Sequence, residues 1–207
     1  MFLTIKEDKL QEEIVEKKSK FIATLFYVEN EEKAQEIIKA VKKQYFDARH
    51  NCYAYRIMNE GTIIERQSDD GEPSGTAGGP MLNILSKNNL CNVLVIVTRY
   101  FGGILLGTGG LVRAYSESTI KVVELANFAN ETWGLEVEIE INYTQLEFIK
   151  YYCKKNNISI INILYENNIK CYLEVTEHEL EDILDNSKNS FNILNYKIIC
   201  SKNIRKI

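Results

Sequence analysis

The stretch NVLVIVTRY, residues 92–100, decides the fold of the first part of this 207-residue chain. Its apolar run is continuous, which is typical of a strand buried on both faces of a sheet. The glycine-rich loop FGGILLGTGG follows at 101–110, and the spacing of the next residues predicts a long helix at 111–126. The packed side of that helix is expected to carry Leu111, Ala114, Ser118, Val122 and Leu125.

Upstream of this strand, alternating β-forming residues, a helical stripe and turn residues predict a further set of elements. They are, in order, a strand at 20–28, a helix from Asn30 to near Tyr45, a hairpin of 51–57 and 62–66 around Asn59-Glu60-Gly61, and a short helix from Pro80 to Lys87.

Downstream, near residue 130, the composition changes and a second set of elements begins. The sequence predicts a strand at 133–142, a helix at 145–155, strands at 158–165 and 169–176, a helix at 177–186 with Thr176 as N-cap, and a strand at 196–201. This βαββαβ order is that of ferredoxin-like domains. We therefore expect an α+β protein with two domains, 1–131 and 132–207.

Composition favours a cytoplasmic protein. Hydrophobic residues make up 45% and charged residues 26% of the chain, which is ordinary for a globular protein. No apolar run is long enough to span a bilayer, and the N-terminus lacks an apolar signal core. The five cysteines are widely spaced without a CxxC pair, so we expect free buried thiols and no zinc finger. On balance we expect no cofactor and no metal.

The charge is distributed evenly along the chain. Residues 1–131 carry 16 Lys and Arg against 18 Asp and Glu, and residues 132–207 carry 9 against 11, so each part has a net charge of −2. Neither part has the basic excess of a dedicated nucleic-acid-binding domain, and nothing signals DNA. Any binding of nucleic acid would therefore depend on a local site.

The loop DDGEPSGTAGGP, residues 69–80, leaves three interpretations open. Asp69, Asp70 and Glu72 could hold a hard cation such as Mg²⁺. The glycines, with Thr76 near a helix start, could bring backbone N–H groups to an anion. Asp and Gly are also ordinary turn residues. The pattern matches neither a P-loop nor a dinucleotide-binding fingerprint.

Two arginines flank the second glycine-rich loop. Arg99 ends the buried strand, and Arg113 lies in the first turn of the following helix, where a cation opposes the helix dipole. Their anionic partner could be the acidic loop or a phosphate. His50 and Cys52 share a strand face and could in principle form an activated nucleophile, although ordinary packing is the more common meaning.

The runs DARHNCYAY, SDDGEPSGTAGGPML and NVLVIVTRYFGGILLGTGGLVRAYSES resemble the motifs of the IMPACT/YigZ family, in its bacterial two-domain form. The resemblance implies a first domain like the second domain of a small-subunit ribosomal protein, a sheet with helices on one face. It implies a ferredoxin-like second domain and, for both, a likeness to domains of elongation factor G. Eukaryotic members restrain a starvation-sensing kinase pathway through an additional N-terminal domain, which we do not expect here.

The resemblance also implies a ligand-binding site. The matching positions are Arg49, His50, Asp69, Asp70, Glu72, Thr76, Arg99, Tyr100, Gly102, Gly103, Gly107, Gly109 and Arg113. Together they predict a polar groove in which the arginines meet an anion and the carboxylates orient the arginines. Glu136, Glu138 and Glu140 on the second domain's sheet would repel phosphate there.

The resulting hypothesis is a translation-associated binding or regulatory protein whose partner is RNA or a ribosome-associated protein, with no membrane partner. The alternative is an enzyme acting on a small phosphorylated or peptide substrate, with Mg²⁺ as a possible requirement.

Overall fold

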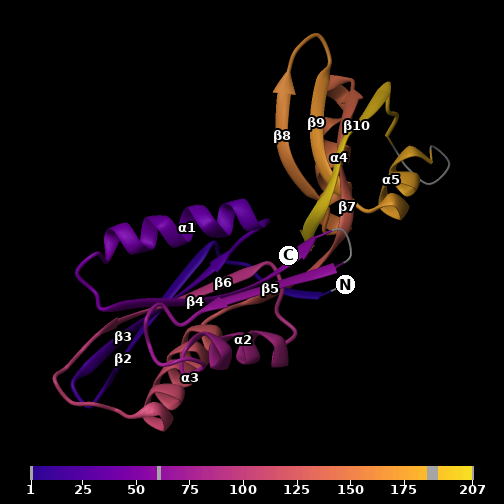
Figure 1. Cartoon of the computed structure of the whole chain (residues 1–207). Coiled ribbons are helices and arrows are strands. Elements are labelled where there is room, and N and C mark those ends of the chain that lie inside the picture. The colour runs from indigo at the N-terminus through magenta and orange to yellow at the C-terminus, as the bar shows by residue number, and fades with distance from the viewer. Residues whose placement is uncertain (1, 60–61, 186–190, 207) are drawn as a thin grey trace. The chain divides into compact units, whose positions relative to one another are not determined.

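A computed structural model describes residues 2–59, 62–185 and 191–206. The chain divides into two compact units, Phe2–Phe128 and the residues from Ala129 onward (Figure 1). The sequence placed the boundary between residues 131 and 132. The strand β7 (Phe128–Ile141) runs across that position. It begins five residues before residue 133, where the sequence predicted its start.

The first unit is built on an antiparallel sheet with the order β2-β3-β6-β4-β5. Its strands are β2 (Lys9–Glu16), β3 (Ser19–Tyr27), β4 (His50–Asn59), β5 (Thr62–Ser68) and β6 (Val93–Tyr100). The strand β6 lies at the centre and is buried along its length up to Arg99. Glu60 and Gly61 of the predicted hairpin turn lie outside the described residues.

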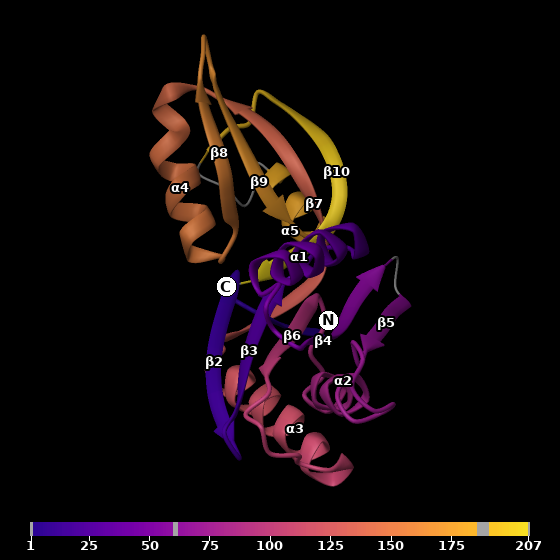
Figure 2. The same cartoon turned by 60° about the vertical axis from the view of Figure 1, so that its left-hand side comes forward.

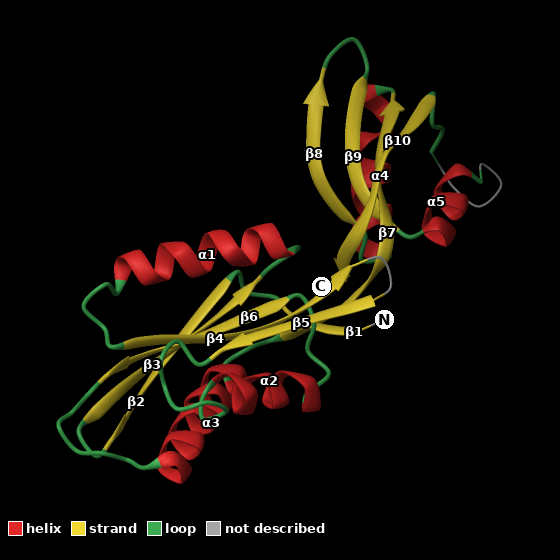
Figure 3. Ribbon diagram, in the orientation of Figure 1, coloured by secondary structure: helices red, strands yellow, loops and turns green. Residues whose placement is uncertain are grey.

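Helices cover both faces of this sheet, as Figures 1 and 3 show. The helix α1 (Glu31–Gln44) packs Ala34, Ile38 and Val41 against Leu94 and Ile96. On the other face, α2 (Gly78–Lys87) and α3 (Thr108–Glu124) enclose the alternate residues of β6, Val93, Val95 and Val97. The α+β class is confirmed, but the expectation of helices on one face is wrong for this unit. The continuous apolar run of β6 supplies two buried faces, and each needs a helical layer.

Two strands occur where the sequence predicted none, β1 (Phe2–Ile5) and β2. The strand β2 lies at the sheet edge, and its charged residues leave Ile14 as its one buried side chain. Charged edge strands discourage pairing with other chains, and they lack the apolar pattern by which strands are recognised.

The second unit has the predicted βαββαβ order and a ferredoxin-like sheet, in the antiparallel order β10-β7-β9-β8. After β7 come a short 3-10 turn, Tyr143–Gln145, then α4 (Leu146–Lys155), β8 (Ser159–Tyr165), β9 (Ile169–Val175), α5 (Glu177–Leu184) and β10 (Asn195–Lys206). Figure 2 shows α4 alongside β8 and β9. Both helices pack on one sheet face through Ile149, Cys153, Leu180 and Ile183.

Thr176 caps α5 as predicted. Its side chain accepts from the backbone N–H of Glu179, whose carboxylate accepts from the N–H of Thr176 at 2.7 Å, which completes a capping box. The helix ends two residues before Asn186, which lies outside the described residues. No helix in the described part of the chain has the length and apolar content needed to cross a bilayer.

Candidate functional site

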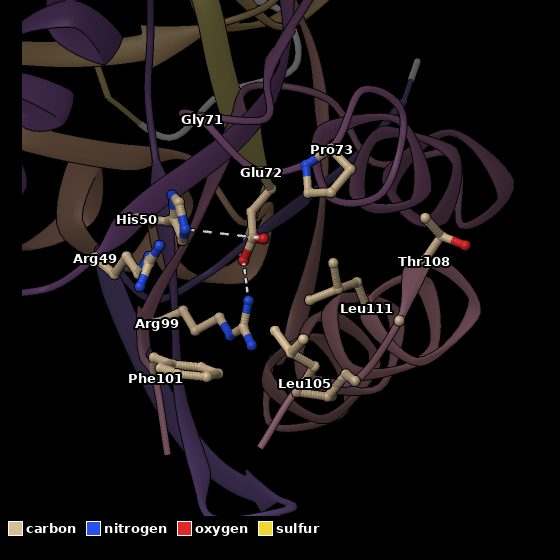
Figure 4. A pocket seen from close by; sticks show the side chains of 12 residues that line it. Arg49, His50, Gly71, Glu72, Pro73, Arg99, Phe101, Leu105, Thr108 and Leu111 are labelled. Carbon is tan, nitrogen blue, oxygen red and sulfur yellow. Dashed lines mark hydrogen bonds and ion pairs between the residues drawn. The ribbon is translucent and has the colours of Figure 1, made fainter. Parts of the chain in front are cut away.

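A groove with a volume of about 380 Å³ opens in the first unit where β4 begins and β6 ends (Figure 4). It is lined by Arg49, His50, Gly71, Glu72, Pro73, Arg99, Phe101, Leu105, Leu106, Gly107, Thr108 and Leu111. We call this set of residues the groove.

Strand register brings the groove together from three separate segments. His50 pairs with Arg99 in the antiparallel ladder of β4 and β6, and the Arg49 N–H donates to the Arg99 carbonyl at 3.1 Å. The loop between β5 and α2 supplies Glu72 from above these strand ends. Residues 105–107 of the loop after β6 and the first turn of α3 form the opposite wall.

Glu72 is the centre of the polar side. Its side chain is 4% exposed, and Oε1 accepts from Arg99 Nη1 at 2.5 Å and from the Tyr115 hydroxyl at 2.8 Å. A buried carboxylate is tolerated only when it is paired and hydrogen-bonded, as it is here. Its other oxygen, Oε2, lies 3.8 Å from His50 Nε2.

His50 is held by the acidic loop. Its Nδ1 lies 2.8 Å from the Asp70 carbonyl oxygen, which can only accept, so Nδ1 carries the hydrogen. The Nε2 atom therefore faces the groove and Glu72. This orientation leaves Nε2 as the atom of His50 that can contact a ligand.

Two arginine side chains meet over one aromatic ring. The guanidinium carbon atoms of Arg49 and Arg99 lie 5.5 and 5.7 Å from the centroid of Phe101. Arg99 is buried and its charge is paired with Glu72, but its Nε has no hydrogen-bond partner among the described residues. Arg49 is exposed and has no ion-pair partner in the described part of the chain.

The N-terminus of α3 forms part of the same groove. Its N-cap residue, Gly107, has φ of 72°, and no side chain caps the helix. The first N–H groups of a helix lack internal partners and carry partial positive charge. A 17-residue helix that begins uncapped at Thr108 therefore adds to the positive potential of the groove.

The acidic loop does not gather its carboxylates into a metal site. Asp69 accepts from the backbone N–H groups of Gly75, Ala77 and Gly78 at 2.8, 3.0 and 2.9 Å. Burial raises the pKa of Asp69, but these hydrogen bonds outweigh it and lower the pKa below the usual value. Asp70 instead binds Lys42 Nζ at 2.6 Å and the Asn51 N–H at 2.7 Å.

No cluster of metal-ligating side chains occurs among the residues that the structure describes. The carboxylates of Asp69, Asp70 and Glu72 each have a different set of protein partners. Of the interpretations left open for this loop, the turn accounts for Asp69 and Asp70, and the partnership with an arginine accounts for Glu72 alone.

Several predicted site residues lie elsewhere. Arg113 is exposed and lines a separate hollow of about 160 Å³ with Glu16, Lys17 and Glu117, and it pairs with none of the loop carboxylates. The Thr76 hydroxyl donates to the Pro73 carbonyl at 2.6 Å, and the Tyr100 hydroxyl donates to Asp47 at 2.9 Å. The predicted residues that line the groove are Arg49, His50, Glu72, Arg99 and Gly107.

The other glycines of the second loop have different surroundings. A Cβ on Gly102 would lie 2.0 Å from the backbone of Lys18, so this glycine permits close packing against the turn between β2 and β3. Gly103 has φ of 85° and faces open space, as does Gly109 in the first turn of α3. None of these glycines lines the groove.

Tyr115 is a residue behind the groove, in contact with Glu72, that the sequence did not single out. It is fully buried, and its hydroxyl donates to Glu72 and lies 3.3 Å from the Cys52 thiol, which is 3.0 Å from the Asp69 carbonyl oxygen. Burial raises the pKa of Cys52 to about 12 and strongly raises that of Tyr115. Tyr115 lies four residues after Leu111 and therefore on the packed side of α3. Leu125 was predicted on that side, but it is 47% exposed. The helical spacing could therefore have identified Tyr115.

On the second unit, the sheet face opposite the helices carries the predicted glutamates. Glu136 binds Lys202, Glu138 accepts from the Tyr172 hydroxyl at 2.6 Å, and Glu140 accepts from Asn168 at 2.9 Å. These contacts hold the three carboxylates in place on this face.

The fold defines a class, that of α+β proteins in which a helix-covered antiparallel sheet precedes a ferredoxin-like unit. The family model described as the Impact N-terminal domain matches residues 17–123, and the chain belongs to the IMPACT family. It is 40% identical over 178 residues to the IMPACT family member YvyE of Bacillus subtilis, covering 86% of this chain and 81% of that protein.

Two further comparisons agree. The chain is 38% identical over 154 residues to the IMPACT family member YigZ of Escherichia coli, covering 72% of this chain and 74% of YigZ. A crystal structure described as that of a hypothetical protein matches with a TM-score of 0.64 at 30% identity. That match covers 93% of this chain and 96% of the other, so the likeness includes both units.

Proposed function

We propose that this protein is a translation-associated binding or regulatory protein whose groove takes an anionic ligand, and that the ligand is RNA. Membership of the IMPACT family supports the association with translation, which the sequence resemblance implies. The geometry of the groove supports the chemistry of the ligand.

The observation that carries the proposal is the unpaired charge of Arg49 beside the Arg99–Glu72 pair. Glu72 neutralises one guanidinium, and Arg49 remains without a carboxylate on the same Phe101 ring. The uncapped start of α3 adds partial positive charge. The one guanidinium left without a carboxylate, that of Arg49, is stabilised by an anion placed beside it.

A phosphate suits this arrangement. A guanidinium presents a planar fork of donors that matches two phosphate oxygens, and helix N-termini bind phosphate through backbone N–H groups. The net charge of −4 provides no long-range attraction for RNA, so affinity must arise within the groove.

A filter-binding titration with structured RNA at 50 and 200 mM salt tests this function. We expect binding at low salt that weakens at high salt and falls in Arg49→Ala and Arg99→Lys. The lysine keeps a charge beside Glu72 but loses the fork. Arg66→Ala is the matched control, because Arg66 is exposed on β5 away from the groove. The proposal is contradicted if no RNA binds at low salt, or if both groove variants bind RNA with the affinity of the wild type.

The alternative function is an enzyme acting on a small phosphorylated or peptide substrate. The observation that favours it is His50 Nε2 facing Glu72 within the groove, since a histidine beside a carboxylate can transfer protons. Thermal-shift measurements with nucleotides, peptides and divalent ions distinguish the two. Stabilisation by a metabolite that the protein then converts supports the enzyme, and insensitivity to all of them contradicts it.

A ribosome-associated protein is the other proposed partner. Purification of the tagged protein from lysate, with and without ribonuclease, distinguishes an RNA partner from a protein partner. Loss of ribosomal material after nuclease treatment supports RNA as the ligand, whereas retention of a protein partner supports direct protein binding.

A further inference from the structure

The groove is small and has two chemically different walls. One wall carries Arg49, Arg99 and His50, and the other carries Leu105, Leu106 and Leu111 beside the start of α3 (Figure 4). Its volume of about 380 Å³ is that of a small-molecule pocket and not that of a surface that follows a nucleic-acid helix. A ligand that fills it must present an anionic group to one wall and an apolar face to the other.

Arg99 limits what can reach the polar wall. Its side chain is 6% exposed, so only a group that enters the groove can contact it. The phosphates of a duplex lie on the outside of a thick rod and are flanked by neighbouring phosphates. A phosphate at a chain end, or on a free nucleotide, has no such neighbour on one side.

We infer that the groove binds a terminal nucleotide, with its phosphate at Arg49 and Arg99 and its base against the leucines beside the start of α3. This inference rests on the proposed RNA-binding function and specifies the part of RNA that is bound. The shared chemistry is a nucleoside 5′-monophosphate, which is present at the 5′ end of an RNA strand and in a free nucleotide.

The charges fit a terminal phosphate better than an internal one. An internal phosphodiester carries one negative charge, whereas a terminal phosphate monoester is close to doubly ionised at pH 7. For the phosphate the groove offers the unpaired Arg49 and the free Nε–H of Arg99, and the start of α3 on the opposite wall adds partial positive charge.

The leucine wall supplies the surface for the base. Leu105 is 82% exposed and Leu106 is half-buried, although both lie beside a polar site. A base stacked on this wall would remove apolar surface from water and so gain affinity. Inorganic phosphate has no such face and would use the polar wall alone.

The test compares four probes by fluorescence anisotropy and by competition. They are a single-stranded RNA octamer with a 5′-phosphate, the same octamer with a 5′-hydroxyl, its circular form, and adenosine 5′-monophosphate as competitor. We expect the 5′-phosphorylated strand to bind about 10- to 100-fold more tightly than the other two RNAs, the range given by one or two charge-assisted hydrogen bonds. Adenosine monophosphate should displace it more effectively than inorganic phosphate does.

Two variants locate the effect. Arg49→Ala should remove the preference for the strand with a 5′-phosphate. Leu105→Ser should reduce the advantage in affinity that adenosine monophosphate has over inorganic phosphate as a competitor. Phe46→Ser is the matched control for the leucine, because Phe46 is 84% exposed and does not line the groove. The control should retain wild-type preferences.

The outcomes separate this inference from the proposed function. Equal affinity for all three RNAs overturns end recognition while leaving RNA binding in place. Binding of adenosine monophosphate without binding of any RNA overturns the RNA function and supports the nucleotide chemistry of the groove. Binding of neither overturns both.

Discussion

Arg99 Nη1 lies 2.5 Å from Glu72 Oε1, and the two side chains are 6% and 4% exposed. The residues are 27 positions apart, at the end of β6 and in the loop before α2. This buried ion pair fastens the loop to the central strand and neutralises one of the two groove guanidiniums. As a result, Arg49 is the cation left for a ligand.

Replacing one member of this pair should destabilise the first unit. Glu72→Ala leaves the Arg99 charge buried without a partner, which costs about 3–5 kcal/mol in comparable pairs. Urea denaturation should show that loss, and the double variant with Arg99→Ala should lose less than the sum of the two single variants. Arg66→Ala is the control, because its exposed contact with Glu31 at 3.9 Å should be worth less than about 1 kcal/mol. Additive losses would contradict the importance of the pair.

Replacement by alanine should change the stability of the protein differently at Gly102, in the loop after β6, and at Gly109, in the first turn of α3. Gly102→Ala places a Cβ 2.0 Å from the Lys18 backbone, which cannot move aside as a flexible side chain would. We expect a loss of more than about 2 kcal/mol in thermal or urea unfolding. Gly109→Ala meets no atom within 4 Å in the first turn of α3 and should be neutral or stabilising by up to about 1 kcal/mol. Equal effects would show that the close approach at Gly102 is not needed.

Asp69 should contribute stability that depends on pH. Its folded-state pKa is lowered, so its contribution is complete above the ordinary value of 3.8 and is lost as the pH falls through the folded-state pKa. Asp69→Ala removes the acceptor of three backbone N–H groups and should cost about 1–3 kcal/mol at pH 7. The difference between wild type and variant should shrink below pH 3.8, measured by urea unfolding at a series of pH values. A difference that is constant with pH would contradict this role.

The cysteines should differ sharply in reactivity. Burial raises the pKa of Cys52 and Cys153 to about 12 and of Cys171 to about 11. At pH 8 a thiol with a pKa of about 12 is ionised only to about one part in 10⁴. Iodoacetamide should therefore label the native protein once, at the exposed Cys200, as read by mass spectrometry.

The Cys200→Ser variant is the matched control and should remain unlabelled until urea is added. In urea the wild type should take up five labels, one for each cysteine. Rapid labelling of Cys52 in the native state would contradict the assignment of its thiol to the buried contact with Tyr115 and would favour a reactive nucleophile there.

The sequence by itself determined the elements that depend on local pattern. The apolar run of 92–100, Asn30 at a helix start and Thr176 as an N-cap each identified an element, because periodicity and capping act within a few residues. The βαββαβ order followed for the same reason. The strand β2 was not predicted, because an edge strand with one buried side chain has little apolar periodicity in its sequence.

Only the tertiary structure decided which polar residues meet. Arg99 and Arg113 look equivalent in sequence, since both flank one glycine-rich loop, yet the strand direction turns Arg99 toward Glu72 and the helix carries Arg113 to another hollow. Asp69, Asp70 and Glu72 are adjacent in sequence but have separate partners. Strand register and helix phase set such long-range contacts, and neither can be read from the neighbouring residues alone.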